Sequence, residues 1–210
     1  SGPGLSLMTE YVGLAYFTET PVVIWDVQRV GPSTGLPTRT AQGDLSMCYK
    51  LGHGDTNYII FIPGSVTECF EFGWKAFDIA EQYQTPVFVL SDLDLGMNQW
   101  MTKKFEYPDK EINRGKILWE NELEKMQAEW GRYLDVDGDG VPYRTVMGNK
   151  HPNSAYFTRG TGHDEFGNYS ENPNTWLKMM NRIKQKFVTV REDLPEPIIR
   201  TKPNATIGII

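Results

Sequence analysis

The strongest constraint on the fold is the alternation of short apolar segments with helical segments in the first half of the chain. Three β-branched runs are typical of buried strands: 21–25, 58–62 and 86–90. The spacing of apolar residues predicts a helix over 5–19, and a capping box of Ser65 and Glu68 starts a second helix that ends near Gln84. Buried strands that alternate with helices pair in parallel beneath helices on both faces. The sequence therefore predicts an α/β fold here.

The second half of the chain has a different, more irregular character. Its spacing predicts an amphipathic helix over 114–130 and another that begins at Asn172 and Pro173. A proline-rich segment, 193–203, is typical of an exposed linker, and 205–210 resembles the start of a further strand. Because the first residue is not Met and the last strand is cut short, we expect an internal fragment of a longer polypeptide.

Charge and composition argue against several classes of protein. The 210 residues carry a net charge of −6, which offers no attractive field for a nucleic acid. The sequence contains no apolar run of the ~18–20 residues needed to span a bilayer. Cys48 and Cys69 are too few for a disulfide framework or for the four thiolates of an iron–sulfur cluster. These features predict a soluble, cytoplasmic protein without nucleic-acid partners.

An acidic turn in the second half matches the opening of a calcium loop. Asp135, Asp137 and Asp139 stand at the first, third and fifth positions, and Gly140 at the sixth. The twelfth position, where a Glu normally closes the coordination shell, is Val146. The turn is therefore either a weak calcium site or a solvated Asp-Gly turn.

Three other local signals are weaker. Gly160 and Gly162 resemble a phosphate-binding loop but lack the preceding strand and the third glycine. His163 and His53 are expected to be surface histidines in turns, with a role as an acid/base group or a ligand as the alternative. The basic residues of the last helix are expected to form its solvated face, with docking of an acidic partner as the alternative: Lys178, Arg182, Lys184, Lys186 and Arg191.

The long loop after the first strand is the strongest candidate site. Ligands of open α/β sheets bind beyond the carboxyl ends of the strands, where Arg29 lies. Several hydroxyl and amide side chains follow it: Ser33, Thr34, Thr38, Thr40 and Gln42. An arginine offers a forked pair of donors to a carboxylate, so the loop suits a small anion. The alternative is a polar loop whose hydroxyls satisfy its own backbone.

The residues of this loop, with 1–8, 71–73 and 86–98, resemble the alpha subunit of 2-oxoacid:ferredoxin oxidoreductases, most closely the 2-oxoglutarate type. This resemblance implies the thiamin diphosphate-binding fold. Residues 1–105 would be the later half of its pyrimidine-binding domain, and 106–200 an irregular, α-rich extension and linker. Residues 201–210 would begin the following domain.

The resemblance also implies an activity: coenzyme A-dependent oxidative decarboxylation of a 2-oxoacid to an acyl-CoA, with electrons passed to ferredoxin. Thiamin diphosphate, magnesium and a [4Fe–4S] cluster would be held mainly by a partner beta subunit. Arg29 matches the arginine that binds the substrate's C1 carboxylate, and Thr38 a threonine associated with the distal carboxylate of 2-oxoglutarate. No catalytic residue is assigned to this chain, and alone it is expected to be inactive. The alternative is a non-catalytic binding or assembly module with a calcium-binding turn.

Overall fold

The computed structural model describes residues 1–126 and 129–208. Its sheet has three parallel strands in the order β1-β3-β2. The strands are β1 (Val22–Gln28), β2 (Ile59–Phe61) and β3 (Pro86–Asp92). The helices are α1 (Gly2–Thr18), α2 (Leu45–Tyr49), α3 (Val66–Tyr83), α4 (Leu93–Met97), α5 (Glu120–Lys125) and α6 (Pro173–Val190), with short 3-10 helices η1 (Pro152–Ser154) and η2 (Arg191–Asp193).

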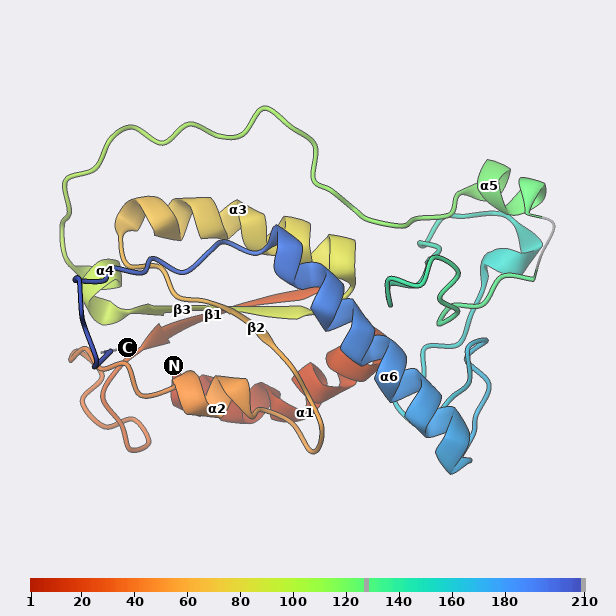
Figure 1. Ribbon diagram of the computed structural model, residues 1–210, viewed down its shortest axis with the longest axis horizontal. Helices are drawn as coiled ribbons and strands as arrows, with labels where there is room; N and C mark the ends of the chain where they lie inside the picture. The colour runs from red at the N-terminus through yellow and green to blue at the C-terminus, as the bar shows by residue number, and fades with distance from the viewer. Residues whose placement is uncertain (127–128, 209–210) are drawn as a thin grey trace.

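Helices cover both faces of the sheet, as Figure 1 shows for α3 on one side and for α1 and α2 on the other. Alternate residues of β3 point to opposite faces because the side chains of a strand have a period of two. Phe88 and Leu90 pack in a core cluster with Leu5 of α1, whereas Val87 and Val89 pack in a second cluster with residues of α3. The predicted α/β class is therefore confirmed.

α3 begins as its capping residues predict. The Ser65 hydroxyl accepts a hydrogen bond from the Glu68 amide at 3.1 Å, and the Glu68 carboxylate accepts one from the Gly64 amide at 2.7 Å. Two otherwise unpaired amides at the helix start are thus satisfied.

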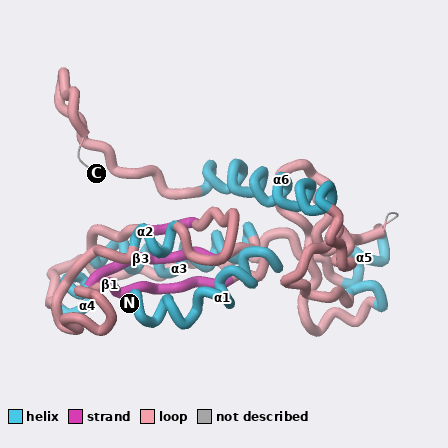
Figure 2. Tube along the Cα trace, turned by 90° about the horizontal axis from the view of Figure 1, so that it is seen from below, coloured by secondary structure: helices cyan, strands magenta, loops and turns pink. Residues whose placement is uncertain are grey.

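The last helix returns to this core from the far end of the chain. α6 runs from the irregular segments of the second half back across the sheet end where the strands begin (Figures 1 and 2). Ile183 joins the first core cluster and Val190 the second. The carboxyl ends of the strands, beside α4, lie at the opposite end of the molecule (Figure 1). This arrangement leaves the loop after β1 away from α5 and from the start of α6, whereas the segment after α6 runs back toward the α4 end of the molecule (Figure 1).

The predicted helix over 114–130 is wrong over most of its described length, since only Glu120–Lys125 is helical and 127–128 lie outside the described residues. Gly115 has a φ of +67°, and a Cβ there would lie 2.7 Å from the Gln82 carbonyl oxygen. A residue in this conformation cannot sit inside a helix. The Trp119 amide donates to the Glu122 carboxylate at 3.0 Å, which fixes the helix start one residue later.

Residues 98–119, between α4 and α5, instead form an irregular segment along α3, here called the strap (Figure 1). Phe105 of the strap stacks on Phe70 of α3 with 4.6 Å between ring centroids. Further along, Lys110 forms an ion pair with Asp78 at 2.5 Å.

The expected strand over 205–210 is not seen in its described part, because residues 205–208 are exposed and no described strand lies beside them. Residues 209–210 lie outside the described range. Among the described helices, each is too short or too polar to cross a membrane.

Candidate functional site

The candidate site begins where β1 and β3 end. Gln28 and Asp92 are the last register pair of these two parallel strands, so their side chains meet at the same edge of the sheet. Both are almost completely buried, at 3% and 6% exposed. The predicted strands ended earlier, at 25 and 90, and this edge pair was missed. The polar residues Gln28, Ser91 and Asp92 continue the strands because the parallel ladder pairs their backbones.

The loop after β1 folds back on itself. The Val30 amide donates to the Arg39 carbonyl at 3.0 Å, and the Leu36 amide to the Val30 carbonyl at 3.2 Å. Gly35 makes this closure possible: its φ is +47°, and a Cβ would lie 2.2 Å from the Val30 carbonyl oxygen. The closure brings the segment that contains Thr38 alongside the one that contains Arg29.

The two side chains singled out by sequence remain accessible. Arg29 is half-buried, and its Nη1 donates to the Thr34 carbonyl at 3.2 Å. Thr38 lies in the exposed stretch 31–40. The loop thus offers a guanidinium and a hydroxyl on one turn at the carboxyl edge of the sheet, an arrangement suited to hydrogen-bonding a small carboxylate.

Two hydrogen bonds hold the far end of the loop to the sheet. Gln42 Nε2 donates to Asp92 Oδ2 at 2.7 Å, and the Asp44 amide donates to Gln28 Oε1 at 3.0 Å. Asp92 Oδ1 also accepts from the Leu95 amide at 3.0 Å, which caps α4. Asp92 therefore uses both carboxylate oxygens.

A cavity of about 300 Å³ lies beside these bonds. Its wall includes Gln42, Asp92, Ser65 at the start of α3, and Trp100 and Thr102 of the strap. The capping box at 65–68 and the acidic residue after the third strand are the sequence signals that could have pointed to it.

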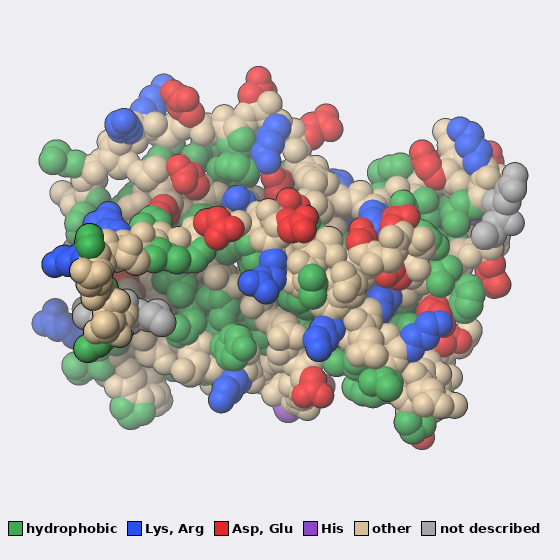
Figure 3. Space-filling view, viewed as in Figure 1, with side chains coloured by type: hydrophobic (Ala, Val, Ile, Leu, Met, Phe, Trp, Pro, Cys, Tyr) green, Lys and Arg blue, Asp and Glu red, His purple; other side chains and the backbone are tan. Residues whose placement is uncertain are grey.

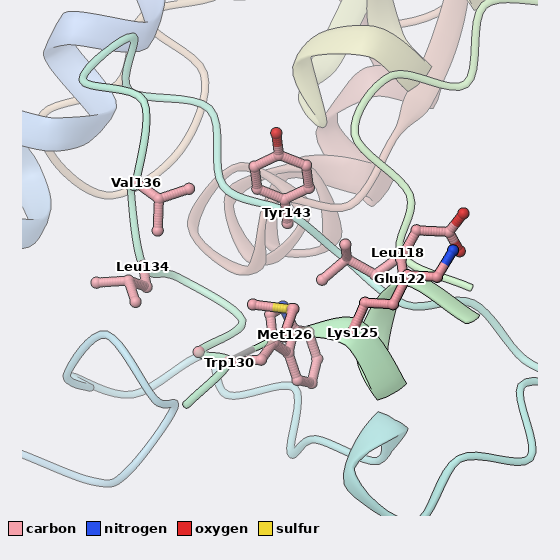
Figure 4. A pocket seen from close by; sticks show the side chains of 9 residues that line it. Leu118, Glu122, Lys125, Met126, Trp130, Leu134, Val136 and Tyr143 are labelled. Atoms are coloured by element: carbon pink, nitrogen blue, oxygen red, sulfur yellow. The ribbon is translucent and has the colours of Figure 1, made fainter. Parts of the chain in front are cut away.

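The cavity drawn in Figure 4 has about 390 Å³ and lies in the second half of the chain. Its wall is mostly apolar: Leu118, Met126, Trp130, Leu134 and Val136, with Glu122, Lys125 and Tyr143 among the other side chains. All its described lining residues come from 118–143, so it is separate from the loop that carries Arg29.

The acidic turn at 135–140 is organised around a lysine. Asp135 accepts hydrogen bonds from the amides of Gly138 and Gly140, both at 2.9 Å. The Lys116 ammonium lies 2.6 Å from the Asp137 carboxylate and 2.8 Å from that of Asp139. Its hydrogen bond lowers the pKa of Asp137. Within 1–126 and 129–208, no group of three or more His, Cys, Asp or Glu side chains is arranged to hold a metal ion.

His163 was expected at the surface and is instead buried, at 1% exposed. Its ring stacks on Tyr133 with 3.9 Å between centroids and lies 4.8 Å from the ring of Phe17 in α1. Burial lowers the pKa of His163. Aromatic packing between the two halves of the chain accounts for the burial of His163. His53, in contrast, is exposed as expected.

The basic face of α6 was also expected to be solvated, and two of its residues are not. Arg182 and Lys186 are buried and both contact the Glu19 carboxylate, which is fully buried; the Lys186 contact is 2.7 Å. Lys178 forms an exposed ion pair with Glu165. Lys184 and Arg191 are exposed.

Burial opposes ionisation of Glu19, but the charges of Arg182 and Lys186 outweigh it and lower the pKa of Glu19 to about 2. Burial also lowers the pKa of Lys186, to about 8, and Glu19 only partly compensates. Both pKa values are lowered for a common reason: the single Glu19 carboxylate lies among three cations, Arg182, Lys186 and Arg132. These cations favour the ionised form of Glu19, and the two arginines disfavour the charged form of Lys186.

Comparisons with a family model and with known proteins all indicate the same family. Residues 1–165 match the model of the family described as pyruvate flavodoxin/ferredoxin oxidoreductase, thiamine diP-binding. The 2-oxoglutarate synthase subunit KorA of Methanothermobacter marburgensis is 39% identical over 199 residues, which cover 92% of this chain and 49% of that protein. The 2-oxoacid:ferredoxin oxidoreductase 2 alpha subunit of Aeropyrum pernix is 38% identical over 93% of this chain and 29% of that protein.

A solved structure supports the same family. It is the 2-oxoglutarate:ferredoxin oxidoreductase of Magnetococcus marinus with 2-oxoglutarate, coenzyme A and succinyl-CoA bound. The match has a TM-score of 0.83 and 32% identity, and covers 93% of this chain but 32% of that one. The chain thus spans half or less of the length of these three relatives. The expected resemblance and fold are confirmed: the chain belongs to the pyruvate flavodoxin/ferredoxin oxidoreductase family and matches its thiamine diphosphate-binding domain.

Proposed function

We propose that the chain is part of the alpha subunit of a 2-oxoacid:ferredoxin oxidoreductase of the 2-oxoglutarate type. The complete enzyme would decarboxylate the 2-oxoacid oxidatively, form an acyl-CoA with coenzyme A, and pass the electrons to ferredoxin. The observation that carries this proposal is the closed loop with Arg29 and Thr38 at the carboxyl edge of a parallel sheet. Relatives that are 38–39% identical and named for these activities support it over a non-catalytic binding or assembly module.

In this proposal Arg29 and Thr38 divide the recognition of the substrate. The Arg29 guanidinium binds the C1 carboxylate, since two of its N–H groups can donate to both oxygens at once. The Thr38 hydroxyl donates to the distal carboxylate, which 2-oxoglutarate has and pyruvate lacks. The accessibility of both side chains supports these roles, because neither must leave a buried contact to meet a ligand.

The described residues of this chain do not fit the metal groups that the family uses. A [4Fe–4S] cluster needs four thiolates, and the chain has two cysteines, Cys48 and Cys69. Burial raises the pKa of Cys48 to about 12, which keeps it a thiol. The described carboxylates form no cluster for the magnesium ion that accompanies a diphosphate. We therefore assign the thiamin diphosphate, magnesium and cluster mainly to the beta subunit and derive no step through them here.

The remaining partners follow from the same proposal: the beta subunit, ferredoxin, coenzyme A and a 2-oxoacid, in the cytoplasm. The proposal also divides the chain. Residues 1–105 would belong to the pyrimidine-binding domain, 106–200 to an extension and linker, and 201–210 to the start of the next domain.

Steady-state kinetics of the complete alpha–beta enzyme test the proposal. Arg29→Ala should lower kcat/KM at least about tenfold for both 2-oxoglutarate and pyruvate, because a charge-assisted forked contact is lost. Arg29→Lys should restore only part of the lost kcat/KM, since an ammonium group lacks the forked pair of donors of a guanidinium. Thr38→Ala should lower kcat/KM for 2-oxoglutarate more than for pyruvate.

Thr201→Ala, in the exposed segment after α6, is the control and should leave both values unchanged. Near-normal activity of Arg29→Ala, or equal losses on both acids for Thr38→Ala, would show that this loop does not hold the substrate.

A further inference from the structure

We propose that Gln28, Gln42 and Asp92, together called the strand-end clamp, are positioning residues for substrate binding. The clamp fixes the returning end of the 29–42 loop to the sheet and so holds Arg29 and Thr38 at the carboxyl edge. This inference rests on the proposed function and adds residues that touch neither substrate nor reacting atoms.

The clamp is built on the longest strand pairing of the described sheet. Gln28 and Asp92 close this β1–β3 ladder, and both side chains are buried. Each presents an acceptor to the loop: Oε1 of Gln28 to the Asp44 amide at 3.0 Å, and Oδ2 of Asp92 to Gln42 Nε2 at 2.7 Å. The anchoring atoms are therefore fixed before the loop docks.

The loop itself has little other support. Residues 31–40 are all exposed, and the backbone hydrogen bonds of Val30, Leu36 and Arg39 join residues of the loop to one another. Internal bonds fix the shape of the loop but leave its tilt relative to the sheet undetermined. The clamp bonds from Gln42 and Asp44 supply that second attachment, so the direction of the Arg29 guanidinium depends on them.

The donor direction makes the proposal testable at Gln42, which is exposed and therefore replaceable without damage to the core. Its amide must donate, since ionised Asp92 accepts only. Gln42→Lys keeps a donor of similar reach, Gln42→Ala removes it, and Gln42→Glu brings a second carboxylate against Asp92. In the complete alpha–beta enzyme, KM for 2-oxoglutarate should rise about tenfold for Ala and further for Glu. It should stay within about threefold of wild type for Lys, and kcat should change little in all three.

Limited proteolysis by an arginine-specific protease, which does not cut after the lysine of Gln42→Lys, provides a readout that does not depend on activity. Arg39 lies in the exposed loop, and freeing the loop should raise the rate of cleavage after it several-fold in Gln42→Ala and Gln42→Glu but not in Gln42→Lys. Gln185→Ala, an exposed glutamine of α6 far from the sheet edge, is the matched control for both assays.

Suppose that Arg29→Ala is impaired, but Gln42→Ala and Gln42→Glu are cleaved faster with an unchanged KM. The Gln42–Asp92 bond would then be structural only, and the positioning role would be overturned. Unchanged cleavage in all variants would overturn the clamp itself, whatever the activity. If Arg29→Ala retains normal activity, the proposed substrate loop is wrong, and any faster cleavage in Gln42→Ala would then be evidence of a tether alone.

Discussion

Lys116 occupies the position at which a metal ion would meet the carboxylates of the 135–140 turn. Its ammonium contacts Asp137, Asp139 and the Val141 carbonyl, the last at 3.0 Å. Asp135 is directed to backbone amides instead. A calcium ion would have to displace the ammonium and would find no closing carboxylate at Val146.

We therefore predict weak calcium binding by this turn, with a Kd on the order of 10⁻⁴ M or higher. Isothermal titration calorimetry of the wild type and of Lys116→Met measures it. The variant should bind somewhat more tightly, because the competing cation is gone. A micromolar Kd for the wild type would contradict the prediction.

At the residue scale, the sequence predicts the role of a side chain when that role depends on its neighbours along the chain. Arg29 lies four residues after the predicted first strand, so the sequence alone places its guanidinium at the carboxyl edge of the sheet. Asp92 differs, because its partner Gln42 is 50 residues away and meets it only through the β1–β3 register. His163 differs for the same reason: its neighbours Phe17 and Tyr133 come from other parts of the chain.

At the scale of elements, the interface of α1 and α6 depends on a buried ion cluster. Glu19 ends α1, and Arg182 and Lys186 reach it from α6, 163 residues away in the first case. Arg132 donates to the Glu19 backbone carbonyl at 2.8 Å and ties the irregular segment to the same point. A carboxylate that is fully buried among cations cannot be removed without leaving their charges unpaired.

Glu19→Gln should lower the free energy of unfolding by about 3–5 kcal/mol, the range for breaking one partner of a buried ion pair. Urea denaturation monitored by circular dichroism measures the loss. The control is Glu165→Gln, whose partner Lys178 is exposed, and it should lose at most about 1 kcal/mol. Equal losses in the two variants would show that the buried cluster is not a special source of stability.

Lys186 should give this cluster a pH dependence in alkali. The pKa of Lys186 is lowered to about 8 from its ordinary 10.5, so between these values the unfolded chain keeps a proton that the folded chain has released. Stability rises with pH wherever the unfolded state binds more protons. Relative to Lys186→Met, the wild type should therefore gain stability between pH 8 and 10, by roughly fortyfold in the unfolding equilibrium constant.

Denaturant curves of both proteins at several pH values test this difference. Lys184→Met removes an exposed lysine of the same helix, and its difference from wild type should stay flat over the same range. A flat difference for Lys186→Met as well would contradict the lowered pKa.

For α6 and α3, the spacing of residue types predicts only part of which side chains are buried. The spacing in α6 identified a basic face, yet only the fold brings Glu19 opposite to it. The apolar spacing in α3 predicts an inner stripe of Val66, Phe70, Gly73, Phe77 and Ala80. Ala80 is buried, but Phe77 is 51% exposed, and Ala76, Ile79 and Tyr83 are buried although they lie outside that stripe. Phe70, also expected inside, packs instead against the strap through Phe105. A strap without regular structure leaves no periodic signal, so its effect on α3 could not be read from the sequence.

At the scale of the whole molecule, the proposed substrate loop lies apart from the packing of α6. The loop with Arg29 and Thr38 lies at the carboxyl edge of the sheet, whereas α5 and the start of α6 lie at the other end (Figures 1 and 2). The surface drawn in Figure 3 carries both acidic and basic side chains without a field of one sign. On this face no field of one sign would attract the proposed substrate, so its recognition would depend on the side chains of the loop.

This separation predicts that the isolated chain does not turn over. In the proposed function Arg29 and Thr38 hold the 2-oxoacid, but oxidative decarboxylation must also deliver two electrons to an acceptor. The two cysteines of the chain cannot form a four-thiolate cluster, and the pKa of each is raised, first of all by burial. We expect no viologen reduction when the chain is mixed anaerobically with 2-oxoglutarate, coenzyme A, thiamin diphosphate and magnesium. The complete alpha–beta enzyme, assayed in parallel, should reduce the dye. Substrate-dependent reduction by a preparation free of other subunits would mean that this chain holds a redox centre of its own.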